Sequence, residues 1–108
     1  MIRVNGAPSL ALPYSESFET APTFPGTDGY IVNTDNGTTW SRVTTAASAG
    51  TACIRINNYT NTAGQVDDWI TGAFDFSNVT SLTMTFKVAN AQRNSSSADQ
   101  LTVAGSTN

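Results

Sequence analysis

The chain has 108 residues, the length of one domain, with 12% charged residues and a formal net charge of −3 at pH 7. Its five Lys and Arg residues are scattered and form no basic stripe, so we exclude nucleic-acid binding. The 17 Thr, 11 Ser and 10 Asn residues favour pleated strands and polar turns, and the composition therefore predicts an all-β fold.

The first third of the sequence predicts a linker followed by two short strands. Residues 1–13 are small, apolar and interrupted by proline, and we interpret them as a linker or a loose N-terminal edge. Residues 14–19 alternate in polarity between flanking prolines, which predicts a first strand. A loop rich in proline and glycine follows, and residues 30–33 predict a short second strand. We expect the folded domain to span residues 14–108.

The middle of the chain predicts a turn and two further strands. Residues 35–37, Asp-Asn-Gly, are a strong turn signal because Asn-Gly tolerates positive φ. Residues 38–44 and 52–57 are then predicted strands, separated by a loop of small residues. Cys53 is the only cysteine and the chain has no histidine, so an internal disulfide and a Cys/His zinc site are excluded.

The stretch at residues 66–88 is the predicted centre of the core. Its first half is dense in aromatic residues, and its second half, residues 81–88, alternates strictly between apolar and polar side chains. The apolar positions of that second half are Leu82, Met84, Phe86 and Val88. A period of two predicts a half-buried strand. Asp75 and Ser77-Asn78 supply the chemistry for a turn between the two halves, so both halves are predicted strands.

A last strand is predicted at residues 100–104, with Leu101 and Val103 pointing inward. The pattern therefore predicts six to seven antiparallel strands arranged as a β-sandwich. We expect no helices, because no window of the sequence has helical periodicity. We also expect no membrane insertion, because no segment approaches the ~20 apolar residues that a spanning helix needs.

The order of the motifs resembles a known family. PYSESFE, NTDNGTTW, ACIRIN, DDWITGAFDFSNVTSLTMTFKVANA and DQLTV follow one another from about Pro13 to Asn108. This order is similar to that of the choice-of-anchor and cleaved-adhesin domains of large secreted proteins of the Bacteroidetes type, and more distantly to MAM domains. Gly72 stands in place of a usual proline and Tyr30 in place of a usual tryptophan. The resemblance implies a jelly-roll β-sandwich that is truncated at its C-terminus, since a jelly roll has about eight strands.

The resemblance also implies a function. It points to a non-catalytic adhesion or attachment module of a secreted or cell-surface protein, whose partner is a polysaccharide or a cell-surface or matrix protein. Related modules often carry a structural calcium ion, and oxygen ligands suit Ca²⁺. By their position in the motifs, Glu19 and Asp68 are the expected ligands, and Asp67 and Asp99 are further candidates. Solvated loop carboxylates are the alternative interpretation of these four residues.

Two other functions remain open, and neither is enzymatic. One is a carbohydrate-binding module in which Tyr59 and Trp40 stack on a sugar, although Trp40 also fits a core position. The other is an interaction fragment that a second chain completes, because a sandwich with too few strands leaves an unpaired sheet edge. We do not expect an enzyme, since hydrolysis needs two carboxylates across a cleft, which the sequence alone cannot place, and the family that the chain resembles is not hydrolytic.

Overall fold

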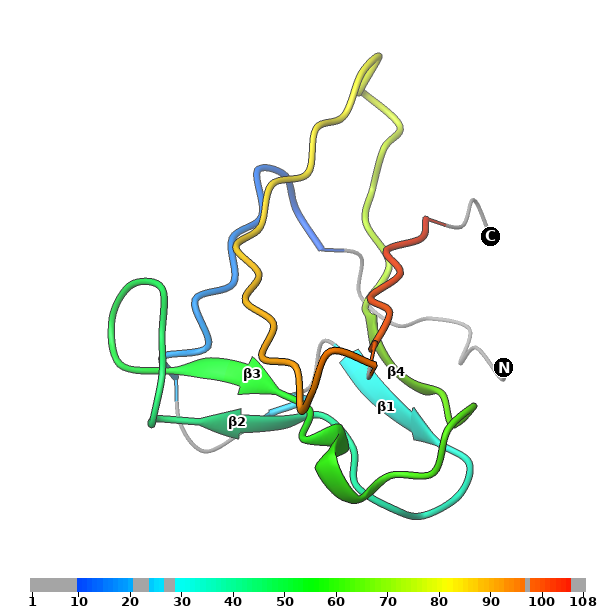
Figure 1. The fold of residues 1–108 in the computed structure, drawn as a ribbon. Helices are drawn as coiled ribbons and strands as arrows, with labels where there is room; N and C mark the ends of the chain where they lie inside the picture. The colour runs from blue at the N-terminus through cyan, green and yellow to red at the C-terminus, as the bar shows by residue number, and fades with distance from the viewer. Residues whose placement is uncertain (1–9, 21–23, 27–28, 97, 106–108) are drawn as a thin grey trace.

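The computed structural model describes residues 10–20, 24–26, 29–96 and 98–105. Its regular elements are β1 (Gly29–Asn33), β2 (Ser41–Val43), β3 (Cys53–Arg55), the 3-10 turn η1 (Asn58–Thr60) and β4 (Asp67–Thr71) (Figure 1). The described part contains strands, turns and coil without an α-helix, which confirms the all-β class. Within these residues we find no helix with the length and hydrophobicity to cross a membrane.

Strands β1 and β4 form an antiparallel sheet whose two faces differ. The register pairs Gly29 with Thr71 and Asn33 with Asp67 at the two ends. Because side chains alternate between faces, one face carries a set that we call the inner face: Gly29, Ile31, Asn33, Asp67, Trp69 and Thr71. The opposite face carries Asp68, which is exposed. The inner face carries Trp69 and Asp67, around which two of the sites described below are built.

Strands β2 and β3 form a second antiparallel sheet, with Ser41 opposite Arg55 and Val43 opposite Cys53. This hairpin lies in the chain between β1 and β4, so the shorter pair is nested inside the longer one. The predicted turn at residues 35–37 is confirmed, since the Gly37 N–H donates to Asp35 Oδ1 at 3.0 Å. It leads out of β1, which pairs with β4 and not with β2.

The predicted strand at residues 14–19 is wrong. The chain there has no strand partner, and Phe18 has a φ of 60°. Its carbonyls bond instead to a side chain, because the Arg42 guanidinium donates to the backbone oxygens of Phe18 and Glu19. Residues 1–9 of the predicted linker lie outside the described residues. Leu10, within that linker, forms an isolated parallel bridge with Phe74.

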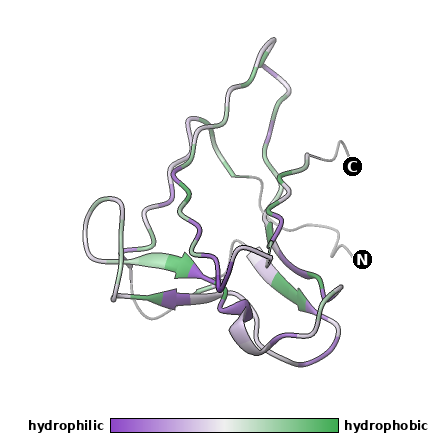
Figure 2. Ribbon diagram, viewed as in Figure 1, coloured by the Kyte–Doolittle hydropathy of each residue, from purple (hydrophilic) through white to green (hydrophobic). Residues whose placement is uncertain are grey.

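The predicted strands at residues 81–88 and 100–104 are also wrong, so the described part has four strands and not six to seven. Leu82, Met84, Phe86 and Val88 are 53–66% exposed. Hydrophobic and hydrophilic residues do alternate along this segment (Figure 2), which lies in the part of the chain that projects beyond both sheets (Figure 1). Alternation gives a segment one apolar face, but a strand also needs a neighbour for its N–H and C=O groups. No described segment pairs with it.

Packing in the described part centres on aromatic rings. Ala52, at 4% exposure, is the one buried hydrophobic residue in the described part. Phe18, Phe24 and Trp69 form a cluster with ring centroids 5.5–6.1 Å apart. A second cluster joins Tyr14 edge-on to Phe74, which stacks on Phe76. The first cluster packs the 14–20 segment against the inner face.

Candidate functional site

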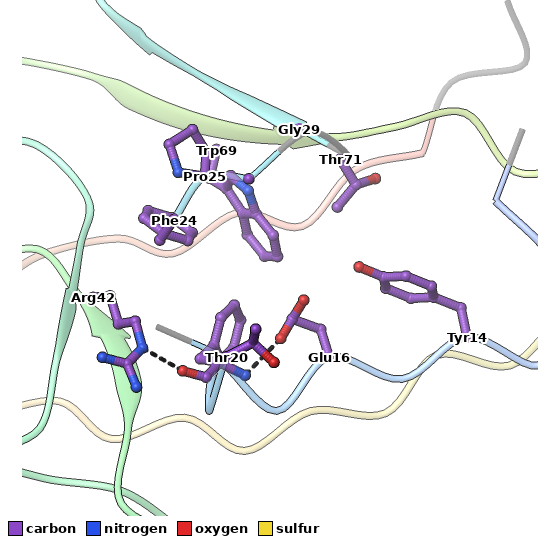
Figure 3. Close-up of a pocket in the computed structure, with 11 residues that line it drawn as sticks. Tyr14, Glu16, Thr20, Phe24, Pro25, Gly29, Arg42, Trp69 and Thr71 are labelled. Atoms are coloured by element: carbon purple, nitrogen blue, oxygen red, sulfur yellow. Dashed lines mark hydrogen bonds between the residues drawn. The ribbon is translucent and has the colours of Figure 1, made fainter. Parts of the chain in front are cut away.

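A cavity of about 250 Å³ lies between the 14–20 segment and the inner face of the β1–β4 sheet. We call it the slot. Its lining residues are Tyr14, Glu16, Phe18, Thr20, Phe24, Pro25, Gly26, Gly29, Arg42, Trp69 and Thr71. Figure 3 shows Trp69, Pro25 and Phe24 along one side, with Glu16 and Tyr14 on the opposite side. The slot therefore combines an aromatic wall with groups that can form hydrogen bonds.

The aromatic wall depends on the close approach of two strands. Trp69 meets Phe18 edge-on at 5.5 Å and Phe24 at 5.7 Å between ring centroids. A Cβ atom at Gly29 would lie 3.1 Å from the indole Nε1 of Trp69 and 2.6 Å from the Ile70 carbonyl oxygen. Glycine at this position thus leaves room for the Trp69 indole nitrogen beside β1. The Trp69 Nε1 is buried and has no hydrogen-bond partner.

The polar wall is held in place by bonds from two charged side chains. Glu16 accepts a hydrogen bond from the Phe18 N–H at 2.6 Å, which closes a tight local turn. Arg42 reaches from β2 and donates to the Phe18 and Glu19 carbonyl oxygens, the second at 3.1 Å. These bonds fix the 14–20 segment at one wall of the slot, and leave a carboxylate and a guanidinium beside the aromatic rings.

Glu19 connects the same segment to the β2–β3 hairpin. Its carboxylate accepts from the Thr51 hydroxyl at 2.7 Å, the Ala52 N–H at 2.8 Å and the Thr51 N–H at 2.9 Å. These bonds, that of the Thr51 hydroxyl first, hold the pKa of Glu19 below its ordinary value. A Cβ atom at Gly50 would lie 2.6 Å from Glu19 Oε1. We call this arrangement the Glu19 latch.

The four predicted calcium ligands are not brought together. Glu19 is engaged in the latch, Asp68 is exposed on the outer face, and Asp99 lies in exposed coil. Asp67 lies apart from them on the inner face, where its backbone oxygen accepts from Trp40 Nε1 at 3.0 Å. The described residues contain no cluster of three or more His, Cys, Asp or Glu side chains.

The two predicted sugar-stacking residues lie outside the slot. Trp40 is partly buried, and its indole N–H bonds to the Asp67 backbone. Tyr59, on η1, is 61% exposed, but the Arg93 guanidinium lies 4.6 Å from its ring centroid and so covers one face. These two rings therefore do not line the cavity that the structure forms.

The slot residues that the sequence did not reveal are Glu16, Phe18, Phe24 and Arg42. Three of them come from the N-terminal segment and its loop, whereas Arg42 comes from β2. Nothing local in the sequence indicates that Arg42 bonds to carbonyl groups more than twenty residues away. The one usable signal is the density of aromatic residues around Phe18 and Phe24, before the first confirmed strand.

Comparison with known proteins assigns neither the fold nor the slot. No family model matches the chain, and no curated protein or solved structure matches it. The family suggested by the motif order therefore stays a prediction, and the function is argued from the geometry.

Proposed function

We propose that this chain is a non-catalytic attachment module of a secreted or cell-surface protein, built on a jelly-roll plan, and that it holds a sugar unit of a polysaccharide in the slot. One observation carries the proposal: a cavity of about 250 Å³ in which an aromatic wall faces Glu16 and Arg42. Protein sites for small molecules typically combine an apolar lining with a few convergent polar groups.

The chemistry of the slot suits a sugar ring. The carbon-bound hydrogens on one side of a pyranose pack against an aromatic surface such as Trp69, while its hydroxyls need donors and acceptors at the edge. The Glu16 carboxylate is an acceptor and the Arg42 guanidinium is a donor. The volume limits the occupant to a small group, so we expect the slot to hold one unit of a longer chain.

Replacing Glu16 with glutamine is expected to weaken polysaccharide binding about tenfold, because a charge-assisted hydrogen bond to a hydroxyl becomes a neutral one. Affinity electrophoresis through gels that contain individual polysaccharides measures the change. The matched control is Asp68→Asn, which alters an exposed carboxylate on the other face of β4.

The same experiment separates the slot from the aromatic pair named from the sequence. Tyr59→Ala is expected to leave binding unchanged, since Tyr59 does not line the slot. Retained binding by Glu16→Gln together with lost binding by Tyr59→Ala would contradict the slot and favour the exposed ring. Absence of retardation for the unmodified chain across the whole panel would contradict sugar binding itself.

A second candidate function follows from the exposed apolar side chains of residues 76–103. Phe76, Leu82, Met84, Phe86, Val88, Leu101 and Val103 are 45–66% exposed. Large apolar side chains exposed on a folded domain often mark an interaction site. An extended strand of a partner protein would pair with this open segment and cover its apolar face, as in strand addition.

Hydrogen exchange tests this second candidate. In the isolated chain the amides of residues 81–88 are expected to exchange within seconds, because the described structure gives them no strand partner. Mass spectrometry of peptic fragments resolves this segment, and β4, which is paired with β1, is the internal control. A monomeric chain, verified by sedimentation, in which residues 81–88 are already protected would contradict strand addition.

A further inference from the structure

We propose that a calcium ion binds at the end of the inner face, between the side-chain oxygens of Asn33, Thr39 and Asp67. We call this group the oxygen cluster. Of the four ligands expected from the motif order it retains only Asp67, and it does not depend on the function proposed for the slot.

The first observation is the state of three oxygen atoms. Asn33 Oδ1, Thr39 Oγ1 and Asp67 Oδ1 are buried and have no hydrogen-bond partner. Nearly all buried polar atoms in folded proteins have a partner, because burial without one is costly, most of all for a carboxylate. Each of these three oxygens therefore calls for a partner that the protein's own groups do not supply.

The second observation is that the backbone gathers these residues. Asn33 and Asp67 are direct partners at the end of the β1–β4 ladder, so their side chains lie next to each other on the inner face. Asn33 Nδ2 donates to the Gly37 carbonyl at 2.9 Å, and Trp40 Nε1 donates to the Asp67 carbonyl at 3.0 Å. These two bonds tie both ends of residues 37–40 to the pair, and Thr39 lies within that span.

The chemistry of the cluster favours calcium. The Asn33 amide nitrogen is already bonded to Gly37, which leaves the amide oxygen as the atom without a partner. The three atoms are then a carboxylate, an amide and a hydroxyl oxygen, which are hard donors that Ca²⁺ accepts alongside backbone carbonyls and water. With a single carboxylate, we expect a dissociation constant of about 10⁻⁴–10⁻³ M, as in extracellular modules.

The residues implied by the motif order fit an ion less well. Three hydrogen bonds from Thr51 and Ala52 already occupy the Glu19 carboxylate. Asp68 is adjacent to Asp67 in sequence, but the alternation of β4 places it on the opposite, exposed face. Asp67 and Asp68 therefore differ in their surroundings, so the same substitution at each gives a test variant and its matched control.

Terbium luminescence tests the site directly on the full chain. Tb³⁺ replaces Ca²⁺ at oxygen sites, and a nearby indole transfers excitation energy to it; Trp40 is bonded to the Asp67 backbone. We expect saturable luminescence that added calcium displaces. Asp67→Asn should weaken terbium binding at least tenfold, whereas Asp68→Asn should leave it unchanged. Equal effects of the two variants, or no saturable signal from the unmodified chain, would overturn the proposal.

Thermal melting gives an independent readout. Because an ion that binds only the folded state stabilises it, millimolar calcium should raise the melting temperature by several degrees over chelator. Thr39→Val removes one ligand and preserves the side-chain shape, so it should reduce this rise in melting temperature and weaken terbium binding. If Asp67→Asn does not fold, Thr39→Val is the variant that tests the site. A water molecule shared by the three oxygens would instead give equal melting with calcium and with chelator, which overturns the proposal.

Discussion

Replacing Trp69 with alanine is expected to lower the free energy of unfolding by about 3 kcal/mol, the cost of truncating a large ring in a packed cluster. Trp69 contacts both Phe18 and Phe24, and these contacts hold the N-terminal segment on the β1–β4 sheet. Among the described hydrophobic residues only Ala52 is buried, so few other contacts can compensate for the loss of the Trp69 ring. Because the free energy of unfolding of a small domain is only about 5–15 kcal/mol in total, the variant should be close to unfolding.

Urea denaturation followed by circular dichroism measures this effect. Tyr59→Ala is the control, since it removes an aromatic ring that is 61% exposed and should change stability by no more than about 0.5 kcal/mol. If Trp69→Ala and Tyr59→Ala have similar midpoints, the three-ring cluster is not the core of the domain.

The second large effect is expected at the Glu19 latch, where Gly50→Ala should destabilise the domain more than backbone strain alone explains. Gly50 has a φ of 72°, and an alanine there costs about 1–2 kcal/mol of strain. In addition, the new Cβ would lie 2.6 Å from Glu19 Oε1 and displace the carboxylate from Thr51 and Ala52. Chemical denaturation measures the loss.

Gly64→Ala is the matched control for this change. Gly64 also has a positive φ, 91°, but no atom lies within 4 Å of the position of its Cβ, so the substitution carries strain without a clash. The excess loss in Gly50→Ala over Gly64→Ala therefore measures the latch. Equal losses in the two variants would show that the contact of Glu19 with this loop does not contribute.

The additional loss of stability in Gly50→Ala relative to Gly64→Ala should also depend on pH. Hydrogen bonds from Thr51 and Ala52 hold the pKa of Glu19 below its ordinary value in the folded state, so its ionised form stabilises the fold. That contribution is complete above the unfolded pKa of about 4.3 and is lost as the pH falls through the lower folded pKa. The gap between Gly50→Ala and Gly64→Ala should therefore narrow below about pH 4.3 and stay constant above it.

Local chemistry in the sequence predicted local structure well. The Asp-Asn-Gly turn is present, with Asn36 at a φ of 56°. The turn predicted at Asp75 is present as well, because the Ser77 N–H donates to Asp75 Oδ1 at 3.0 Å. Each depends on a short polar side chain bonding to a backbone group two residues away, so the necessary partners are contiguous in the sequence. The four observed strands also fall within predicted ones, apart from Gly29 at the start of β1.

Long-range pairing could not be predicted in the same way. Residues 14–19 and 81–88 have the alternation of strands, yet neither has a partner in the described structure. The slot depends on Arg42 bonding to the Phe18 carbonyl and on an indole beside Gly29, contacts between segments that are far apart in the chain. Hydrophobic periodicity reports which face is apolar but carries no information about which segment covers it.

The nesting of β2 and β3 between β1 and β4 has a consequence for the order in which the chain folds. Bringing Asn33 to Asp67 from a fully open coil requires closing a long loop, whereas the β2–β3 hairpin closes a short one. Once the hairpin has formed, the loop that must close between β1 and β4 is effectively shorter, so pairing these two strands costs less conformational entropy. We therefore expect the β2–β3 hairpin to form before the rate-limiting pairing of β1 with β4. The slot should form only after that pairing.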